Sequence, residues 1–389
     1  MKLDPQHFLK RAGIKRLLKA LDAKEGTARF VGGAVRDLLL DVPHDDLDLA
    51  TTLRPDEVTR RLETAGIKAV PTGIDHGTIT AVSSGTVVEV TTLRSDVSTD
   101  GRRATVAFTE DWRQDAGRRD LTINALYADP FTGELFDYFG GLEDLQSRMV
   151  RFIGDPLQRI AEDHLRILRY FRFHARYGHG EPDPGALKAC TDRANDLMAL
   201  SRERIADELL KLLSLPDPTP TVRLMQERGL FEPVVPEVTG VERLALLVAA
   251  ELEAGIAPDP LRRLAALLPP DPSTAERVAA RLKLSNKARK RLASAADTTL
   301  RETIHGLAYR LGIEGAVDRL LLASRPADAA EIAGWTPPRL PIGGRDLMAR
   351  GIDEGPDVAK TLKRIEDAWE KAGFPKGVEF NRIVDQALG

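Results

Sequence analysis

The sequence predicts an α+β protein, in which a small mixed β-sheet domain is followed by an all-helical body. Three observations lead to this prediction. Short runs rich in β-branched residues, parted by glycine and serine, lie before residue 93, and apolar residues at helical spacing dominate after about residue 156. A chain of 389 residues is also too long for one compact core. We expect four parts, at residues 1–147, 148–215, 216–298 and 299–389.

The first part is predicted from helical and strand-like patterns that alternate. Residues 8–21 have helical apolar spacing, and residues 54–66 begin with a proline and two acids and end in glycine, as helices often do. The polar, glycine-containing stretch 94–117 is expected to be a mobile loop. Strands are expected at 29–31, 68–70, 78–82 and 86–92.

The other three parts are predicted to contain only helices. Proline-rich joints at 216–220, 268–272 and 336–341 are plausible seams between subdomains. Helices are expected at 156–177, 185–197, 202–214, 220–229, 242–254, 274–284, 286–297, 301–312, 314–323 and 356–372.

Composition limits the classes of function. The formal net charge is −3 with 30% charged residues, so an RNA-binding surface would have to be a local basic patch. A single cysteine, Cys190, excludes an internal disulfide and a cysteine-based zinc site. The N-terminus lacks an apolar signal core, and no apolar run reaches the length of a membrane span. We therefore expect a cytoplasmic protein without a membrane partner.

The most informative stretch is F-V-G-G-A-V-R-D-L-L-L-D-V-P-H-D-D-L-D-L-A-T, residues 30–51. Gly32 and Gly33 follow a short strand, where they let the backbone approach a bulky anion and precede a helix N-terminus with free N–H donors. The alternation of Asp46 and Asp48 places both carboxylates on one face of a strand. Two carboxylates beside a phosphate-binding turn are suited to hold magnesium against a nucleoside triphosphate.

The order G-G-A-V-R-D and then D-L-D-L-A-T resembles the nucleotidyltransferase signature of the class II CCA-adding enzyme and bacterial poly(A) polymerase family. The resemblance implies a polymerase β-like head followed by a helical neck, body and tail. It also implies template-independent addition of CMP, CMP and AMP, from CTP and ATP, to the 3′ end of tRNA.

The resemblance assigns roles to the residues of this first motif. Asp46 and Asp48 would hold two Mg²⁺ ions for in-line attack of the tRNA 3′-hydroxyl on the α-phosphate. Gly32, Gly33 and Arg36 would contact the triphosphate. Asp37 would orient Arg36. Glu89, on a neighbouring strand, is a candidate third carboxylate or general base.

A second motif, R-R-D-L-T-I-N-A, spans residues 118–125. Arg119, Asp120 and Asn124 offer hydrogen-bonding groups suited to ribose hydroxyls and phosphate. In the family that the sequence resembles, this motif recognises ribose, which would select ribonucleotides over deoxyribonucleotides. F-D-Y-F-G-G-L-E-D-L, at 136–145, resembles the hinge between head and neck, and we assign no chemistry to it.

A third motif, I-A-E-D-H-L-R-I-L-R-Y-F-R-F, spans residues 160–173. Its plain interpretation is a solvated arginine-rich helix face, but the resemblance implies recognition of the nucleobase. Asp163 can accept from the exocyclic amine of cytosine or adenine while Arg166 donates to the ring nitrogen. Uracil and guanine present the opposite pattern and would leave both groups unpaired. Arg169 and Arg172 would steer phosphates or the base from the same helix.

Three further features complete the comparison with the family pattern. His164 replaces the proline that is common after Glu-Asp, and we expect no loss of activity. S-R-E-R-I-A-D-E-L-L, at 201–210, has a capping and packing role. P-I-G-G-R-D-L-M, at 341–348, echoes the first motif without a following Asp-x-Asp, so it is interpreted as a helix start. The tail that it opens resembles the family region that holds the tRNA elbow.

Four alternatives remain open at this stage. A poly(A) polymerase shares the head motifs, but the C-terminal sequence V-D-Q-A-L-G lacks a strongly basic tail. An enzyme that adds only CC or only A is a second alternative, and the intact stretch 94–105 disfavours A-only addition. An inactive RNA-binding protein is disfavoured by the intact pair Asp46 and Asp48. A small-molecule nucleotidyltransferase would leave some 200 helical residues without a purpose. The expected partners are the tRNA acceptor end and elbow, with no DNA.

Overall fold

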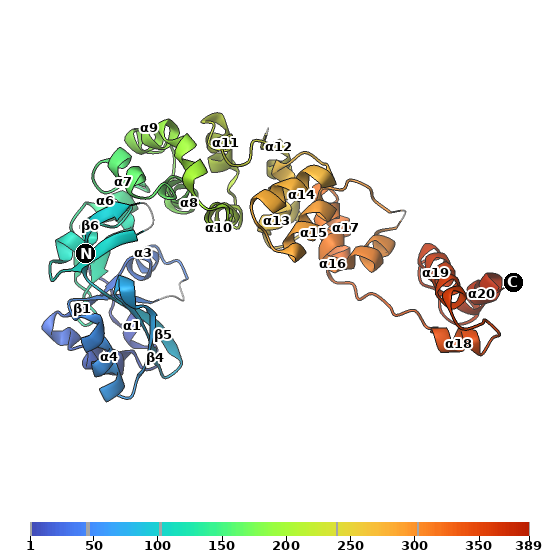
Figure 1. The fold of residues 1–389 in the computed structure, drawn as a ribbon, viewed down its shortest axis with the longest axis horizontal. Helices are drawn as coiled ribbons and strands as arrows, with labels where there is room; N and C mark the ends of the chain where they lie inside the picture. The colour runs from blue at the N-terminus through green and yellow to red at the C-terminus, as the bar shows by residue number, and fades with distance from the viewer. Residues whose placement is uncertain (1, 44–46, 101–102, 239, 302, 389) are drawn as a thin grey trace. The chain divides into compact units, whose positions relative to one another are not determined.

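The structure is a computed structural model, and it describes residues 2–43, 47–100, 103–238, 240–301 and 303–388. The chain divides into two compact units. The first unit comprises Met1–Ser201 with Arg228–Pro233, and the second comprises Arg202–Glu227 with Val234–Gly389. Figure 1 shows the strands in the first unit and helices throughout the second. The α+β prediction is therefore confirmed, whereas the division into four parts remains a prediction.

The first unit contains a mixed sheet. In the described residues its seven strands have the order β3-β4-β5-β2-β1-β8-β9, with β2 and β5 parallel and the other neighbours antiparallel. Apolar side chains of the central strands, such as Phe30, Leu49 and Val90, are fully buried, which fixes the register. The strands are β1 (Ala28–Val31), β2 (Asp48–Thr51), β3 (Lys68–Gly73), β4 (Thr78–Ser83), β5 (Thr86–Thr92), β8 (Leu126–Ala128) and β9 (Leu135–Asp137).

The stretch 94–117 is not the loop that the sequence predicted. It forms a hairpin of β6 (Arg94–Asp100) and β7 (Arg103–Phe108), followed by helix α5 (Trp112–Gly117). The helix begins there because Asp111 caps it by accepting from the backbone N–H of Arg113 at 2.8 Å. The first strand of the hairpin, R-S-D-V-S-T-D, is almost wholly polar, so its sequence lacks the apolar alternation from which a strand is predicted.

Two predicted helices of the first unit are interrupted. Residues 8–21 form α1 (Gln6–Leu9) and α2 (Ile14–Ala20), with Gly13 between them at φ +77°. A Cβ on Gly13 would lie 2.4 Å from the carbonyl oxygen of Ser83, so only glycine fits this close contact with β4.

Residues 156–177 likewise form two helices, α7 (Pro156–Glu162) and α8 (Arg166–Tyr177). Asp163 is extended, with φ −154° and ψ 108°, and its carboxylate accepts from the backbone N–H of Leu165 at 3.1 Å. This local hydrogen bond competes with helix continuation and starts the next helix. The prediction of one continuous helix was therefore wrong.

The unit's other helices are α3 (Gly33–Leu39), α4 (Pro55–Thr64), α6 (Gly141–Gln146) and α9 (Pro184–Asp192), with short 3₁₀ turns at η1 (Ala23–Glu25), η2 (Ile74–His76), η3 (Thr122–Asn124) and η4 (Ala194–Ala199).

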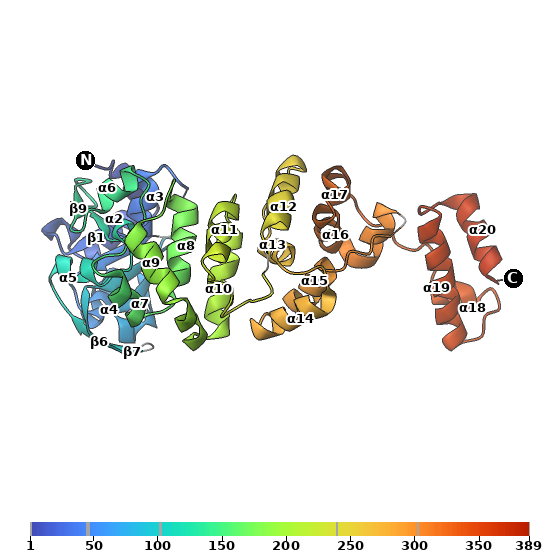
Figure 2. The same ribbon diagram turned by 90° about the horizontal axis from the view of Figure 1, so that it is seen from above.

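The second unit is entirely helical in its described residues, as predicted. Helices α16 and α17 pack side by side (Figure 2). Gly312 interrupts α16 at φ +77°, between the two helices that the sequence predicted there. The elements are α10 (Arg202–Leu213), α11 (Thr219–Glu227), α12 (Glu242–Glu253), α13 (Pro260–Leu267), α14 (Pro272–Arg281), α15 (Asn286–Ala295), α16 (Ile304–Leu322), α17 (Pro326–Ala333), α18 (Gly344–Met348), α19 (Pro356–Lys371) and α20 (Gly377–Leu388).

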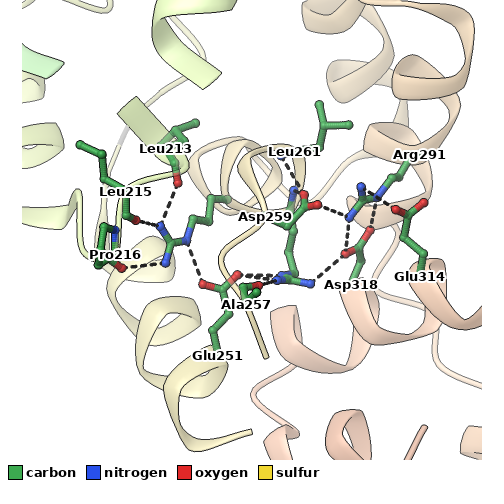
Figure 3. A network of polar contacts seen from close by, with 12 residues as sticks. Leu213, Leu215, Pro216, Glu251, Ala257, Asp259, Leu261, Arg291, Glu314 and Asp318 are labelled. Carbon is green, nitrogen blue, oxygen red and sulfur yellow. Dashed lines mark hydrogen bonds and ion pairs between the residues drawn. The ribbon is translucent and has the colours of Figure 1, made fainter. Parts of the chain in front are cut away.

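Buried ion pairs and hydrogen bonds join four helices of this second unit (Figure 3). Arg262 and Arg263, next to each other on α13, each donate to one oxygen of Glu251 on α12 at 2.8 Å. The Arg263 guanidinium also donates to the carbonyl of Leu213, the last residue of α10, at 2.8 Å and to that of Pro216 at 2.9 Å. Arg262 further contacts Asp318 on α16 at 3.3 Å.

In the described part of the chain, no helix is both long and apolar enough to span a bilayer.

Candidate active site

The glycine pair forms the turn between β1 and α3. Gly32 has φ +67° and ψ −124°, which L side chains rarely adopt, and its N–H donates to the carbonyl of Leu126 on β8 at 3.0 Å. A Cβ on Gly32 would lie 3.4 Å from Nη1 of Arg119. The turn therefore brings bare backbone close to the guanidinium of the second motif.

Two of the three predicted carboxylates lie on neighbouring parallel strands. Asp48, the first residue of β2, pairs in register with Glu89 on β5, so both side chains lie on the same face of the sheet. Asp48 is half-buried and Glu89 is exposed. Asp46 lies outside the described residues. Among the residues that are described, no three histidine, cysteine or acidic side chains form a metal-binding group.

A cavity of about 630 Å³ lies beside these two carboxylates. Asp48 and Glu89 line it together with Arg11, Thr86 and Val87. Arg11 lies in the break between α1 and α2, and Val87 is an exposed apolar residue of β5. The cavity thus combines carboxylates, a guanidinium and an apolar surface.

Arg36 and Asp37 lie inside the protein, and each contacts the neck helix α8. Arg36 is 6% exposed and donates through Nε to Oδ1 of Asp37 at 2.8 Å and through Nη2 to the hydroxyl of Tyr177 at 2.7 Å. The same hydroxyl donates to Oδ1 of Asp37 at 2.9 Å. Burial raises the pKa of Tyr177 to about 12, so the hydroxyl keeps the proton that it donates. Asp37 therefore contacts the Arg36 guanidinium directly, and its role toward a bound nucleotide remains a prediction.

The second motif is tied to the first and to α8. Arg36 donates through Nη1 to the side-chain oxygen of Asn124, whose amide donates to Oδ1 of Asp120 at 3.0 Å. Oδ2 of Asp120 accepts from Nε of Arg169 at 2.7 Å. Arg119 points toward the buried Asp115, with Nη2 at 3.3 Å from Oδ2. The structure therefore brings the two motifs and Arg169 into one polar network.

The ion pair with Arg169 gives a prediction about pH. Burial opposes ionisation of Asp120, but Arg169, Asn124 and the Leu121 N–H outweigh it and lower the pKa of Asp120 to about 2. Since the pKa is below the unfolded value of about 3.9, ionised Asp120 stabilises the fold by about 2–3 kcal/mol above pH 4, and this is lost as the pH falls through 2. A carboxyl NMR titration should give the low midpoint, and Arg169→Met should raise it. An unchanged midpoint in the variant would contradict the assignment.

The predicted base-recognition pair lies at the break between α7 and α8. Arg166, the first residue of α8, donates to Glu162 and to the carbonyl of Arg159 at 2.9 Å, and it approaches the carbonyl of Arg118 at 3.4 Å. Asp163 is half-buried, and its carbonyl accepts from the Arg166 N–H at 3.0 Å. Arg166 thus lies against the second motif, and its guanidinium also donates to Glu162.

Two aromatic residues of α8 at the site were missed by sequence reasoning. Tyr177 contacts Arg36 as described, and the Phe173 ring lies 5.4 Å from the Arg169 guanidinium and 4.6 Å from that of Arg172. Arg169, Phe173 and Tyr177 recur at four-residue spacing, which places them along one stripe of the helix. That spacing was the signal available in the sequence.

Comparisons with known proteins agree with this geometry. The Poly A polymerase head domain family matches residues 28–151, and the family described as the probable RNA and SrmB-binding site of polymerase A matches residues 181–241. The glycine turn, the paired carboxylates and the head-domain match define a nucleotidyltransferase.

Relatives that match over most of their length show which family of nucleotidyltransferases the chain belongs to. The mitochondrial CCA tRNA nucleotidyltransferase 1 of Mus musculus is 36% identical over 96% of this chain and 90% of its own length. The CCA-adding enzyme of Streptococcus gordonii is 32% identical over 93% of this chain and 94% of its own. The crystal structure of the Bacillus stearothermophilus CCA-adding enzyme in complex with CTP matches with a TM-score of 0.75 and 26% identity, over 97% of this chain and 98% of that one. The chain belongs to the CCA-adding enzyme family. Because the mouse relative is mitochondrial, the cytoplasmic location remains a prediction.

Proposed function

We propose that this protein adds CMP, CMP and AMP, from CTP and ATP, to the 3′ end of tRNA and releases pyrophosphate. The observation that carries the proposal is the register of Asp48 with Glu89 beside the Gly32–Gly33 turn, in a chain whose full-length relatives are CCA-adding enzymes. The Bacillus stearothermophilus relative is described in complex with CTP, and a Thermotoga maritima neighbour with the same fold is described with tRNA. Both fit this substrate assignment.

Magnesium is the proposed cofactor. Asp48 and Glu89 present carboxylate oxygens on one face, and such hard oxygen ligands fit Mg²⁺. Asp48, together with Asp46, would hold the metal, with Glu89 as a third carboxylate or general base. Bound Mg²⁺ would neutralise charge on the triphosphate and favour ionisation of the attacking hydroxyl. The chain's own contribution is to hold Asp48 and Glu89 on adjacent strands next to the glycine turn.

The nucleotide is proposed to lie between the glycine turn and the start of α8. Gly32 and Gly33 would approach the triphosphate, with the Arg36 guanidinium lying behind Gly33. Arg119, Asp120 and Asn124 would select ribose. Asp163 and Arg166 would select cytosine and adenine by their Watson–Crick edges, which requires Arg166 to exchange an internal partner for the base. Arg169 and Arg172 would support this selection from the same helix.

The tRNA acceptor end is proposed to occupy the 630 Å³ cavity. In the strand order, β2 with Asp48 separates β1, which leads into the glycine turn, from β5, which lines the cavity. In-line transfer needs the attacking hydroxyl and the leaving pyrophosphate on opposite sides of the α-phosphate. With the nucleotide at the glycine turn and the primer in the cavity, the leaving pyrophosphate and the attacking hydroxyl would lie on opposite sides of Asp48. Arg11 would then contact a primer phosphate, and Val87 an apolar face of the terminal nucleotide.

Arg11→Ala tests this placement. We expect about a fivefold to tenfold higher KM for tRNA and an unchanged KM for CTP, because a single phosphate contact is lost on the primer side. Steady-state kinetics with each substrate varied in turn measures both constants. Lys10→Ala is the matched control, since Lys10 is exposed and carries the same charge one residue away. Equal effects of the two variants would contradict a specific contact with Arg11.

The all-helical second unit is proposed to hold the tRNA elbow through its C-terminal helices. Helix α19 carries Lys360, Lys363 and Arg364 on exposed or half-exposed positions. Such side chains suit phosphate contacts.

The proposed activity can be tested with three tRNA transcripts that end at the discriminator base, at C and at CC. Each transcript is incubated with Mg²⁺ and CTP, ATP, both, or UTP and GTP. Growth of every substrate to CCA, followed by a stop, is the expected result. Long A tracts would instead indicate a poly(A) polymerase, and a stop at CC or activity only on the CC end would indicate a partial enzyme. tRNA binding without incorporation would indicate an RNA-binding protein.

A further inference from the structure

A ring of polar contacts joins α3 and the 120–125 segment to helix α8. The guanidinium of Arg36 is at its centre and contacts Asp37, Asn124 and the Tyr177 hydroxyl. From Asn124 the ring continues through Asp120 to Arg169. We name the following set the α3–α8 latch: Arg36, Asp37, Asp120, Asn124, Arg169 and Tyr177.

The latch holds α8 at two points. Arg169 and Tyr177 are eight residues apart, which is about 12 Å along a helix. Phe173 lies between them and packs its ring 5.2 Å from the Arg36 guanidinium. A twelve-residue helix fixed at two points has little freedom to rotate or slide, and its first residue is Arg166. The latch therefore fixes the start of α8 relative to the glycine turn.

The Tyr177 hydroxyl joins the two charged members of α3. It accepts from Nη2 of Arg36 at 2.7 Å and donates to Oδ1 of Asp37 at 2.9 Å, and the Tyr177 ring lies 4.1 Å from the guanidinium. Both charged side chains are less than a tenth exposed, so water does not readily replace the hydroxyl. A Cβ on Gly33 would lie 3.6 Å from the same Nη2 atom. The hydroxyl thus also sets where the Arg36 charge lies behind the turn.

We propose that Tyr177 is a positioning residue for nucleotide selection, one that acts through Arg36 and α8 without touching the substrate. This inference rests on the proposed function. Loss of the hydroxyl removes no side chain that is proposed to touch the nucleotide, but it takes one partner from Arg36 and loosens the start of α8 against the glycine turn. When the start of α8 is looser, small shifts of Asp163 and Arg166 can accommodate the unpaired groups of a base with the wrong Watson–Crick edge. The site then discriminates less well against such bases.

Tyr177→Phe tests the proposal, with Tyr170→Phe as its matched control. Tyr170 is a fully buried tyrosine of the same helix, and among the described residues its ring contacts Phe152, Phe171 and His174, outside the latch. We expect Tyr177→Phe to reduce the ratio of kcat/KM for CTP to that for UTP about tenfold, and Tyr170→Phe to change it less than twofold. A wild-type ratio in Tyr177→Phe would overturn the proposal, even if the variant were less stable.

Hydrogen exchange gives a second measurement that needs no activity. In the nucleotide-free protein we expect Tyr177→Phe to speed exchange of the α3 amides and the first turn of α8 about tenfold, with no such change in Tyr170→Phe. Unchanged exchange in these segments would overturn the latch whatever the kinetics. Failure of the wild-type protein to extend any tRNA would instead contradict the proposed function, and the exchange experiment would still decide the structural part of the inference.

Discussion

Asp48→Asn is expected to lower kcat for CMP addition by about 1000-fold or more while leaving the protein folded. The substitution keeps the size and shape of the side chain but removes the negative charge that would bind the metal. A loss of this size corresponds to about 4 kcal/mol of transition-state stabilisation. Asp48 is half-buried at the first position of β2, so the backbone pairing with Glu89 is unaffected. Incorporation of labelled CMP and the melting temperature measure the two effects.

The control for this experiment is Asp22→Asn. Asp22 is an exposed carboxylate of the same unit with φ +51°, a conformation that asparagine tolerates well, and it pairs with Arg61. We expect near wild-type activity for this variant. If Asp48→Asn kept more than a tenth of the wild-type kcat, Asp48 would not be a metal ligand.

The position of the glycine turn could be predicted because its signal is local. A strand, two glycines and an amphipathic segment follow one another within twelve residues, and the structure has β1, the turn and α3 in that order. The pairing of Asp48 with Glu89 could not be derived in the same way. It depends on β5 lying parallel to β2 in the sheet. Along the sequence, a helix and two other strands lie between these two strands. Register of this kind depends on packing that no short segment encodes.

The breaks in the predicted helices have a different cause. The helical spacing of apolar residues continues across Gly13 and across Asp163, because the helices before and after each break bury apolar side chains. The breaks themselves come from one atom-level contact each, the approach of Gly13 to Ser83 and the hydrogen bond from Leu165 to Asp163. Tyr177 was missed for a related reason, since its partners Arg36 and Asp37 lie 141 and 140 residues earlier.

Helix α13 shows where binary patterning fails. Its sequence, P-L-R-R-L-A-A-L, places two adjacent arginines in what the structure shows to be the interior, with Arg262 3% and Arg263 1% exposed. Pattern analysis assigns charged residues to the solvent face, so this helix was not predicted. The arginines are tolerated because other helices supply acceptors, namely Glu251 on the preceding helix and the more distant Leu213 and Asp318.

This burial leads to the largest stability effect that we expect. Arg263→Met should lower the free energy of unfolding by about 3–5 kcal/mol, because removing one partner of a buried ion pair leaves the other charge undercompensated. Here Glu251 would retain only Arg262, and the carbonyls of Leu213 and Pro216 would each lose a donor. Urea unfolding followed by far-ultraviolet circular dichroism measures the change.

Arg223→Met is the comparison that separates burial from charge. Arg223 pairs with Glu242 at 2.9 Å, but the side chains are 44% and 71% exposed, so the same substitution should cost at most about 1 kcal/mol. If both variants lost the same small amount, the contacts of Arg263 would be no stronger than a surface pair. A large loss only for Arg263→Met would show that burial, and not charge alone, makes the contacts of this guanidinium with α10 and α12 stabilising.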